Sequence, residues 1–99
     1  MPAMTTFAVQ YTYDDRDARR DEVRPAHRAF LADLFDAGSL LASGPLADDG
    51  GVPGALLIVA ADSDERAADL LDDDPFARNG LIAARVIRAW TPVYGPWTA

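Results

Sequence analysis

The sequence contains no cysteine, no lysine and only one histidine, so arginine supplies all nine of its basic residues. The absence of cysteine excludes disulfides, thiolate metal sites and thiol catalysis. The aspartates do not have the spacing of a calcium-binding loop, and a single imidazole is too few for a zinc site. We therefore predict no metal site.

Long hydrophobic runs and clusters of basic residues are also missing. The longest apolar run, "ALLIVAA" at 55–61, is too short to span a bilayer. The first ten residues do not combine a basic segment with an apolar core, so we expect no signal peptide and a cytoplasmic protein. The net charge of -7 argues against nucleic acid and membrane surfaces as partners. An anionic substrate would need a local arginine.

What the chain does have is a large apolar fraction for its length. Its 99 residues are 49% hydrophobic, which is enough for one small domain over residues 1–99. A chain this short buries only a modest share of its surface, so a partner subunit would help it.

Hydrophobic periodicity divides the chain into strands and helices. Residues 5–13 alternate between apolar and polar positions, as a strand with one apolar face does. Residues 14–22 are charged, and we interpret them as a solvated connection or a frayed helical turn. An amphipathic helix is predicted from Val23 to Ala37, with Pro25 in its first turn and Gly38 at its end.

The second half repeats this alternation of elements. We predict strands at 40–46 and 55–61, joined by turn-forming residues at 47–54, and a strand in 81–95 that Pro92 interrupts. Between them lie a helix within 62–74, for which Ser63 is the candidate N-cap, and one further turn. The order βαββαβ indicates a ferredoxin-like α+β sandwich, with a four-stranded antiparallel sheet and two helices on one face.

Two helices on one face leave the other face of this sheet uncovered. The strand at 55–61 is apolar on both faces, and the last strand has Val86 and Trp90 on one face and Ile87 and Ala89 on the other. An uncovered apolar face on a small domain predicts a partner, and the simplest is a homodimer joined sheet to sheet.

His27 is the first candidate for a functional residue. It shares a helix face with Phe30, Leu31 and Leu34. It is either a core histidine or a group that takes and returns a proton near neutral pH, and the residue alone favours the core role. Arg24 and Arg28 flank it; solvated helix charge and contact with an anionic group are the two interpretations.

Asp74 and the segment Ser43–Gly44–Pro45 are further candidates, each with a structural alternative. Asp74 before a proline is typical of an N-cap, but one carboxylate oxygen can cap while the other orients a histidine. Ser43 at a strand end favours a turn, or contacts a substrate oxygen. Ser43, His27 and Asp74 have the composition of a hydrolytic triad, but no nucleophile elbow surrounds the serine. Tyr11 and Tyr13 are interpreted as core or interface residues.

Four segments in order, "VRPAHRAFL", "AGSLLASGPLADDGG", "DPFARNGL" and "RAWTPVYG", resemble the YCII-related family over nearly the whole chain. The resemblance implies a dimeric ferredoxin-like fold, similar to muconolactone isomerase and the dimeric α/β barrel proteins. It also implies a histidine–aspartate active site, which corresponds to His27 and Asp74. The family's serine–glycine–proline segment corresponds to Ser43, Gly44 and Pro45.

From these residues and this resemblance we predict an enzyme that needs no cofactor. His27 would act as general acid and base, oriented by Asp74, with Ser43, Gly44, Pro45 and Arg24 as substrate-binding residues. Isomerisation or elimination on a small cyclic or unsaturated acid fits best. The alternative is a non-enzymatic ligand-binding or protein-interaction module of the same fold. A cofactor-free oxygenase is a weaker third possibility, because it rests on fold alone.

Overall fold

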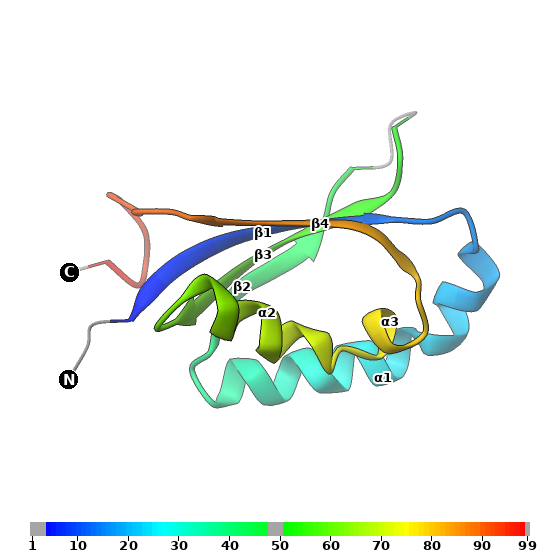
Figure 1. Cartoon of the computed structure of the whole chain (residues 1–99), viewed down its shortest axis with the longest axis horizontal. Helices are drawn as coiled ribbons and strands as arrows, with labels where there is room; N and C mark the ends of the chain where they lie inside the picture. The colour runs from blue at the N-terminus through cyan, green and yellow to red at the C-terminus, as the bar shows by residue number, and fades with distance from the viewer. Residues whose placement is uncertain (1–3, 48–50, 99) are drawn as a thin grey trace.

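The computed structural model describes residues 4–47 and 51–98. Figure 1 shows a sheet with all its helices on one side. The elements are, in order, β1 (Thr5–Tyr13), α1 (Asp17–Asp36), β2 (Leu40–Pro45), β3 (Gly54–Ala61), α2 (Asp64–Asp72), α3 (Pro75–Arg78) and β4 (Ile82–Ala89).

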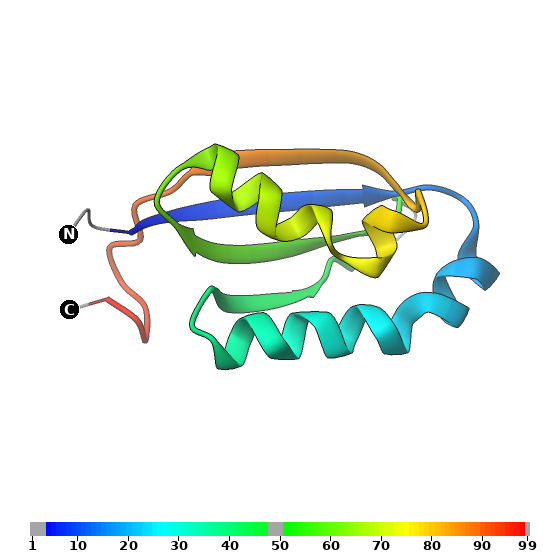
Figure 2. The ribbon, with the colours of Figure 1, turned by 60° about the horizontal axis from the view of Figure 1, so that its bottom comes forward.

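The sheet has the strand order β2-β3-β1-β4, and every neighbouring pair is antiparallel. Figure 2 shows α1 lying along the β2 edge, whereas α2 lies nearer β4. This arrangement confirms the predicted ferredoxin-like α+β sandwich with helices on one face. Part of the turn predicted at 47–54, namely residues 48–50, lies outside the described residues.

The core lies between the sheet and the helices. Alternate residues of β1 point into it, and the same alternation in β3 lets the inward side chains of the two central strands meet the helices. The buried apolar side chains from these strands are Phe7, Val9, Tyr11, Tyr13, Ala55, Leu57, Val59 and Ala61, with Ala67, Leu71, Phe76 and Leu81 opposite.

Helix α1 begins at Asp17, six residues before the predicted start, so the prediction of a charged connection over 14–22 was wrong for most of that segment. The guanidinium of Arg20 is buried and binds the Asp14 carbonyl oxygen at 2.7 Å and the Asp17 carboxylate at 2.5 Å. These contacts hold a polar first turn that has no apolar periodicity to reveal it.

Pro25 therefore lies inside the helix and not in its first turn. A proline there cannot donate a backbone hydrogen bond to the residue four positions earlier, which favours a bend. The first turns of α1, in blue, are inclined to the rest in Figures 1 and 2.

The short helices have the caps that the sequence predicts. The Ser63 hydroxyl accepts a hydrogen bond from the Arg66 backbone N–H at 3.1 Å, which caps α2. Asp74 caps α3, Pro75 is its first residue, and Gly80 follows it with a φ of 66°. Positive φ is readily adopted by glycine, so the chain turns there into β4.

The face of the sheet opposite the helices carries exposed apolar side chains. Leu56 and Val86 are 42% and 53% exposed, and Trp90, just beyond the end of β4, is 42% exposed. Ile58, on the same face, is buried. Over the described residues, no helix is both long and apolar enough to cross a membrane.

Candidate active site

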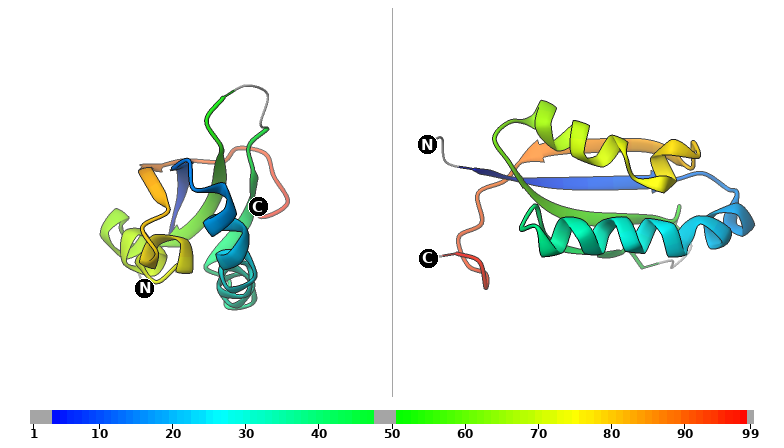
Figure 3. Two further views of the ribbon diagram at one scale, coloured as in Figure 1. Left: turned by 90° about the vertical axis from the view of Figure 1, so that its right-hand side faces the viewer. Right: turned by 90° about the horizontal axis from the view of Figure 1, so that it is seen from below.

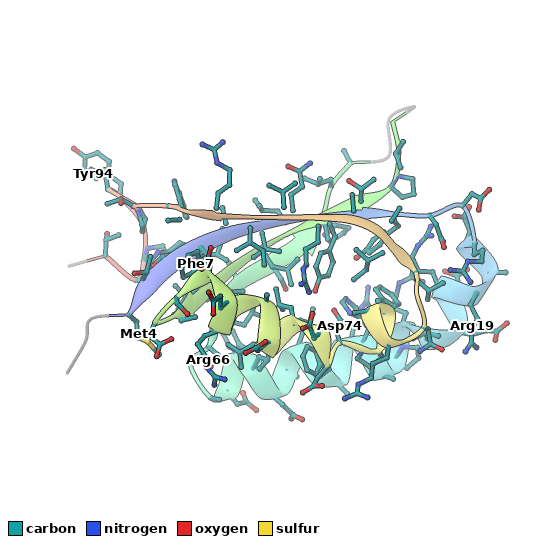
Figure 4. All side chains as sticks on the ribbon, in the orientation of Figure 1. Met4, Phe7, Arg19, Arg66, Asp74 and Tyr94 are labelled. Carbon is teal, nitrogen blue, oxygen red and sulfur yellow. The ribbon has the colours of Figure 1, made fainter. Side chains whose placement is uncertain are left out.

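His27 lies in the middle of α1 and points into the space between that helix and α3. Its side chain is 10% exposed, and its Nδ1 atom is 2.7 Å from Oδ1 of Asp74. Figure 4 shows Asp74 in the helical layer, at the junction between α2 and α3. The structure thus brings together two residues that are far apart in the chain.

Asp74 is completely buried and receives three hydrogen bonds. Its Oδ1 atom accepts from the Phe76 backbone N–H at 2.9 Å as well as from His27, and its Oδ2 atom accepts from the Tyr11 hydroxyl at 3.1 Å. The expectation that one oxygen caps the helix and the other orients the histidine was wrong. A carboxylate oxygen accepts more than one hydrogen bond, so Oδ1 does both.

Tyr11 is the site residue that the sequence did not reveal. Burial, and then the charge of Asp74, raise the pKa of the Tyr11 phenol far above its usual value. The hydroxyl therefore stays protonated and can donate to the carboxylate. Alternation along β1 does place Tyr11 on the inward face, but nothing in the sequence pairs it with Asp74.

An aromatic ring packs on one face of the imidazole and is itself packed against a second ring. The Phe76 ring stacks on His27 with centroids 3.9 Å apart and an angle of 9° between the planes. Tyr13 meets Phe76 edge-on at 5.4 Å, and the Arg20 guanidinium lies over the Tyr13 ring at 5.0 Å. Burial, followed by the charge of Asp74, raises the pKa of Tyr13 to about 12. This stack restricts the rotation of the imidazole.

A cavity of about 290 Å³ opens beside His27 between α1, β2 and β3. All the predicted substrate-binding residues line it. Asp74 does not line it and lies behind the imidazole. The cavity wall consists of Tyr13, Arg24, His27, Arg28, Leu31, Ser43, Gly44, Pro45, Ala55, Leu57 and Phe76.

The second ring nitrogen of His27 is available to this cavity. No described side chain has a buried nitrogen or oxygen atom without a hydrogen-bond partner. Nε2 makes no hydrogen bond to any described residue, so it is open to solvent, and the ring lines the cavity. An imidazole whose Nδ1 is held by a carboxylate can take up or deliver a proton at Nε2.

Two other kinds of site receive no support from this geometry. Ser43 lines the cavity, but within residues 4–47 and 51–98 no hydrogen bond joins it to His27, so a hydrolytic triad is not assembled. Within those ranges there is also no group of three histidine, aspartate or glutamate side chains that could hold a metal ion.

Comparisons with known proteins agree with the fold. The model of the YCII-related domain matches residues 4–91. Protein YciI of Escherichia coli is 35% identical over 95 residues, which are 87% of this chain and 97% of YciI. The derivative of benzaldehyde biosynthesis cluster protein C, from Emericella nidulans, is 28% identical over 68% of this chain and 76% of its own length.

Two solved structures are similar to this one. One is 5-chloro-2-hydroxyhydroquinone dehydrochlorinase (TftG) of Burkholderia phenoliruptrix, in complex with 2,5-dihydroxybenzoquinone. It is 26% identical with a TM-score of 0.73, and the match covers 87% of this chain and 93% of that one. The other is SnoaB, a cofactor-independent oxygenase of Streptomyces nogalater, which is 15% identical with a TM-score of 0.53 over 97% and 99% of the two chains. SnoaB shows likeness of fold alone.

Proposed function

The chain belongs to the YCII-related domain family, and we propose that it is a cofactor-independent enzyme that moves a proton on a small cyclic or unsaturated acid. One observation carries the proposal. His27 has Nδ1 bound to the fully buried Asp74 and its ring on the wall of a cavity. The dehydrochlorinase similarity adds support, because that relative acts on a small oxygenated ring.

The proposed reaction starts when Nε2 of His27 takes a proton from carbon next to a carbonyl group. The electron pair of the broken C–H bond forms the C=C bond of an enolate, while Asp74 stabilises the imidazolium through Nδ1. Return of the proton to a different carbon gives an isomer. If a leaving group occupies the adjacent carbon, the same electron pair expels it as an anion, and the reaction is an elimination.

The test uses solvent deuterium as a reporter of proton transfer. The protein is incubated in D₂O with a panel of hydroxyquinones and unsaturated cyclic keto acids, and exchange or product formation is followed by proton NMR. His27→Gln and Asp74→Asn are expected to slow exchange by about 10²-fold or more, because a positioned acid–base group contributes that much. Asp69→Asn, a change on the exposed face of α2, is the matched control.

The outcome separates this proposal from its alternative. Unchanged exchange in the His27→Gln variant would contradict an acid–base role for the imidazole. Ligands that shift the His27 ring signals but never exchange would instead identify a ligand-binding module of the same fold.

We also propose that two copies of the chain pair through the open face of the sheet. This proposal is supported by the exposed side chains of Leu56, Val86 and Trp90 on that face. Tyr94, which is 93% exposed, projects from the C-terminal segment on the same side (Figure 4). Burying such a patch would stabilise the dimer, because each Å² of apolar surface removed from water contributes about 25 cal/mol of favourable free energy.

A further inference from the structure

A second hollow continues the cavity beside His27. We call it the α1–β2 groove. The groove has a volume of about 440 Å³. Figure 3 shows α1, which supplies one wall of the groove, running alongside the edge of the sheet. Apolar side chains form most of its wall, and these are Leu31, Ala32, Phe35, Leu40 and Ala42.

Three residues form walls of both hollows. Arg28, Leu31 and Ser43 line the cavity beside His27 and also the α1–β2 groove. The two hollows are therefore adjacent, and Arg28 stands on the wall that they share. Phe35 at the far end is 59% exposed, so an apolar group placed there would cover a large ring that now faces water.

Arg28 also differs from Arg24, one turn earlier in α1, in whether its charge is paired. The Arg24 guanidinium pairs with the Asp21 carboxylate one turn away. Over the described residues Arg28 makes no ion pair, although it stands on the shared wall. In a chain with a net charge of -7, an anionic ligand is repelled at long range and needs such a cation nearby.

From this geometry we infer that the substrate is an acid with two apolar parts on either side of its anionic group. Its reacting ring or double bond lies beside His27, its carboxylate binds Arg28, and its second apolar part lies in the α1–β2 groove. The inference rests on the proposed function only for the reacting part of the substrate beside His27. Binding of the carboxylate to Arg28 and of the second apolar part in the groove requires no proton transfer.

Positional isomers of one aromatic acid test this arrangement. Biphenyl-2-carboxylate has its carboxylate at the junction of two rings, biphenyl-4-carboxylate has it at one end, and benzoate lacks the second ring. Calorimetry should find that the 2-isomer binds about tenfold more tightly than either of the others, which is the effect of burying one additional ring. The His27 ring signals should shift with the 2-isomer.

Variants then separate the groove from the cavity. Ala32→Trp fills the groove at a residue that does not line the cavity, and it should remove the tenfold advantage of the 2-isomer while leaving benzoate affinity within twofold. Phe35→Ser should weaken the 2-isomer in the same way. Arg28→Gln should weaken all three acids, and Arg19→Gln, on the exposed surface of the same helix, is the control.

Some results would overturn the inference. Equal affinity for the two isomers would contradict a central anion site, and an Ala32→Trp variant that keeps the advantage of the 2-isomer would contradict the groove. If Ala32→Trp or Phe35→Ser changes the oligomeric state in sedimentation, a second copy of the chain occupies the groove. Ligand binding without proton exchange would leave this inference standing and contradict only the proposed enzymatic function.

Discussion

A carboxylate that is cut off from water must find its hydrogen-bond donors within the protein, and at Asp74 these come from three different elements. A strand supplies the Tyr11 hydroxyl, the long helix supplies the His27 ring, and α3 supplies its own Phe76 backbone N–H. The position of the imidazole is thus set by contacts that the fold requires in any case. Asp74 thus joins the sheet to helices α1 and α3.

The raised pKa values of Tyr11 and Tyr13 predict how the protein unfolds in alkali. In the unfolded chain a tyrosine ionises at a pKa of 10.0, whereas Tyr13 in the folded chain ionises at about 12. Between these values the folded state keeps a proton that the unfolded state has lost, so stability falls as pH rises. Each such tyrosine contributes a slope of up to about 1.4 kcal/mol per pH unit.

Urea unfolding followed by tryptophan fluorescence from pH 9 to pH 12 measures this slope. Tyr13→Phe should lose unfolding free energy less steeply than the wild type above pH 10. Tyr94→Phe, which removes a phenol that is 93% exposed, is the control. Parallel curves for the wild type and Tyr13→Phe would contradict the prediction.

At the scale of elements, the starts of the strands were predictable, whereas the start of the long helix was not. The prediction that the last strand continues within 81–95 past Pro92 was also wrong, because β4 ends at Ala89. The alternation over residues 5–13 coincides with β1. Helix α1 starts earlier than its apolar pattern because ion pairs, such as the one between Arg20 and Asp17, hold its first turn. Periodicity reports which face of an element is buried, and it carries no signal where an element is polar all round.

The candidate site was predictable only in part. Residue type and spacing made His27 and Asp74 candidates, but only the family resemblance pointed to them as one active site, since no rule of local sequence relates residues on two different helices. Their hydrogen bond is now visible, whereas their chemical role stays a prediction. The hydrogen bond from Tyr11 to Asp74 and the stacking of Phe76 on His27 depend on how the sheet and helices pack, which local sequence patterns do not predict.

The pairing of β3 with β1 leaves no room for a side chain at Gly54, the first residue of β3. A Cβ atom added there would lie 2.3 Å from the Tyr11 carbonyl oxygen, a backbone atom that cannot move alone. Gly54→Ala should therefore lower the free energy of unfolding by about 1–3 kcal/mol or more, the range for forcing atoms into a packed region.

Gly44, in β2, provides the matched control. A Cβ atom there would meet nothing within 4 Å, so Gly44→Ala should change stability little or increase it slightly. Urea unfolding of both variants at neutral pH is the measurement. Equal stabilities would show that β3 can move away from β1 at no cost, which contradicts the close approach.

For the whole molecule, the prediction concerns the open face of the sheet. If two copies pair there, Val86→Lys places a charge within the interface and should convert the dimer to a monomer in sedimentation at the same concentration. Val52→Lys, at a position that is 67% exposed outside the strands, should leave the dimer intact. A wild-type protein that sediments as a monomer at high concentration would contradict the pairing.

The double use of Asp74 bears on how descendants of this chain would change. A copy without the proposed chemistry would still need that carboxylate to begin α3, so selection for folding alone would retain it. The imidazole caps no helix, so its loss would cost one hydrogen bond to Asp74 and the stacking on Phe76 but would leave the start of α3 in place. Under the proposed function, an aspartate at this position in a related protein is therefore no sign of activity, and the loss of the histidine is the more informative change.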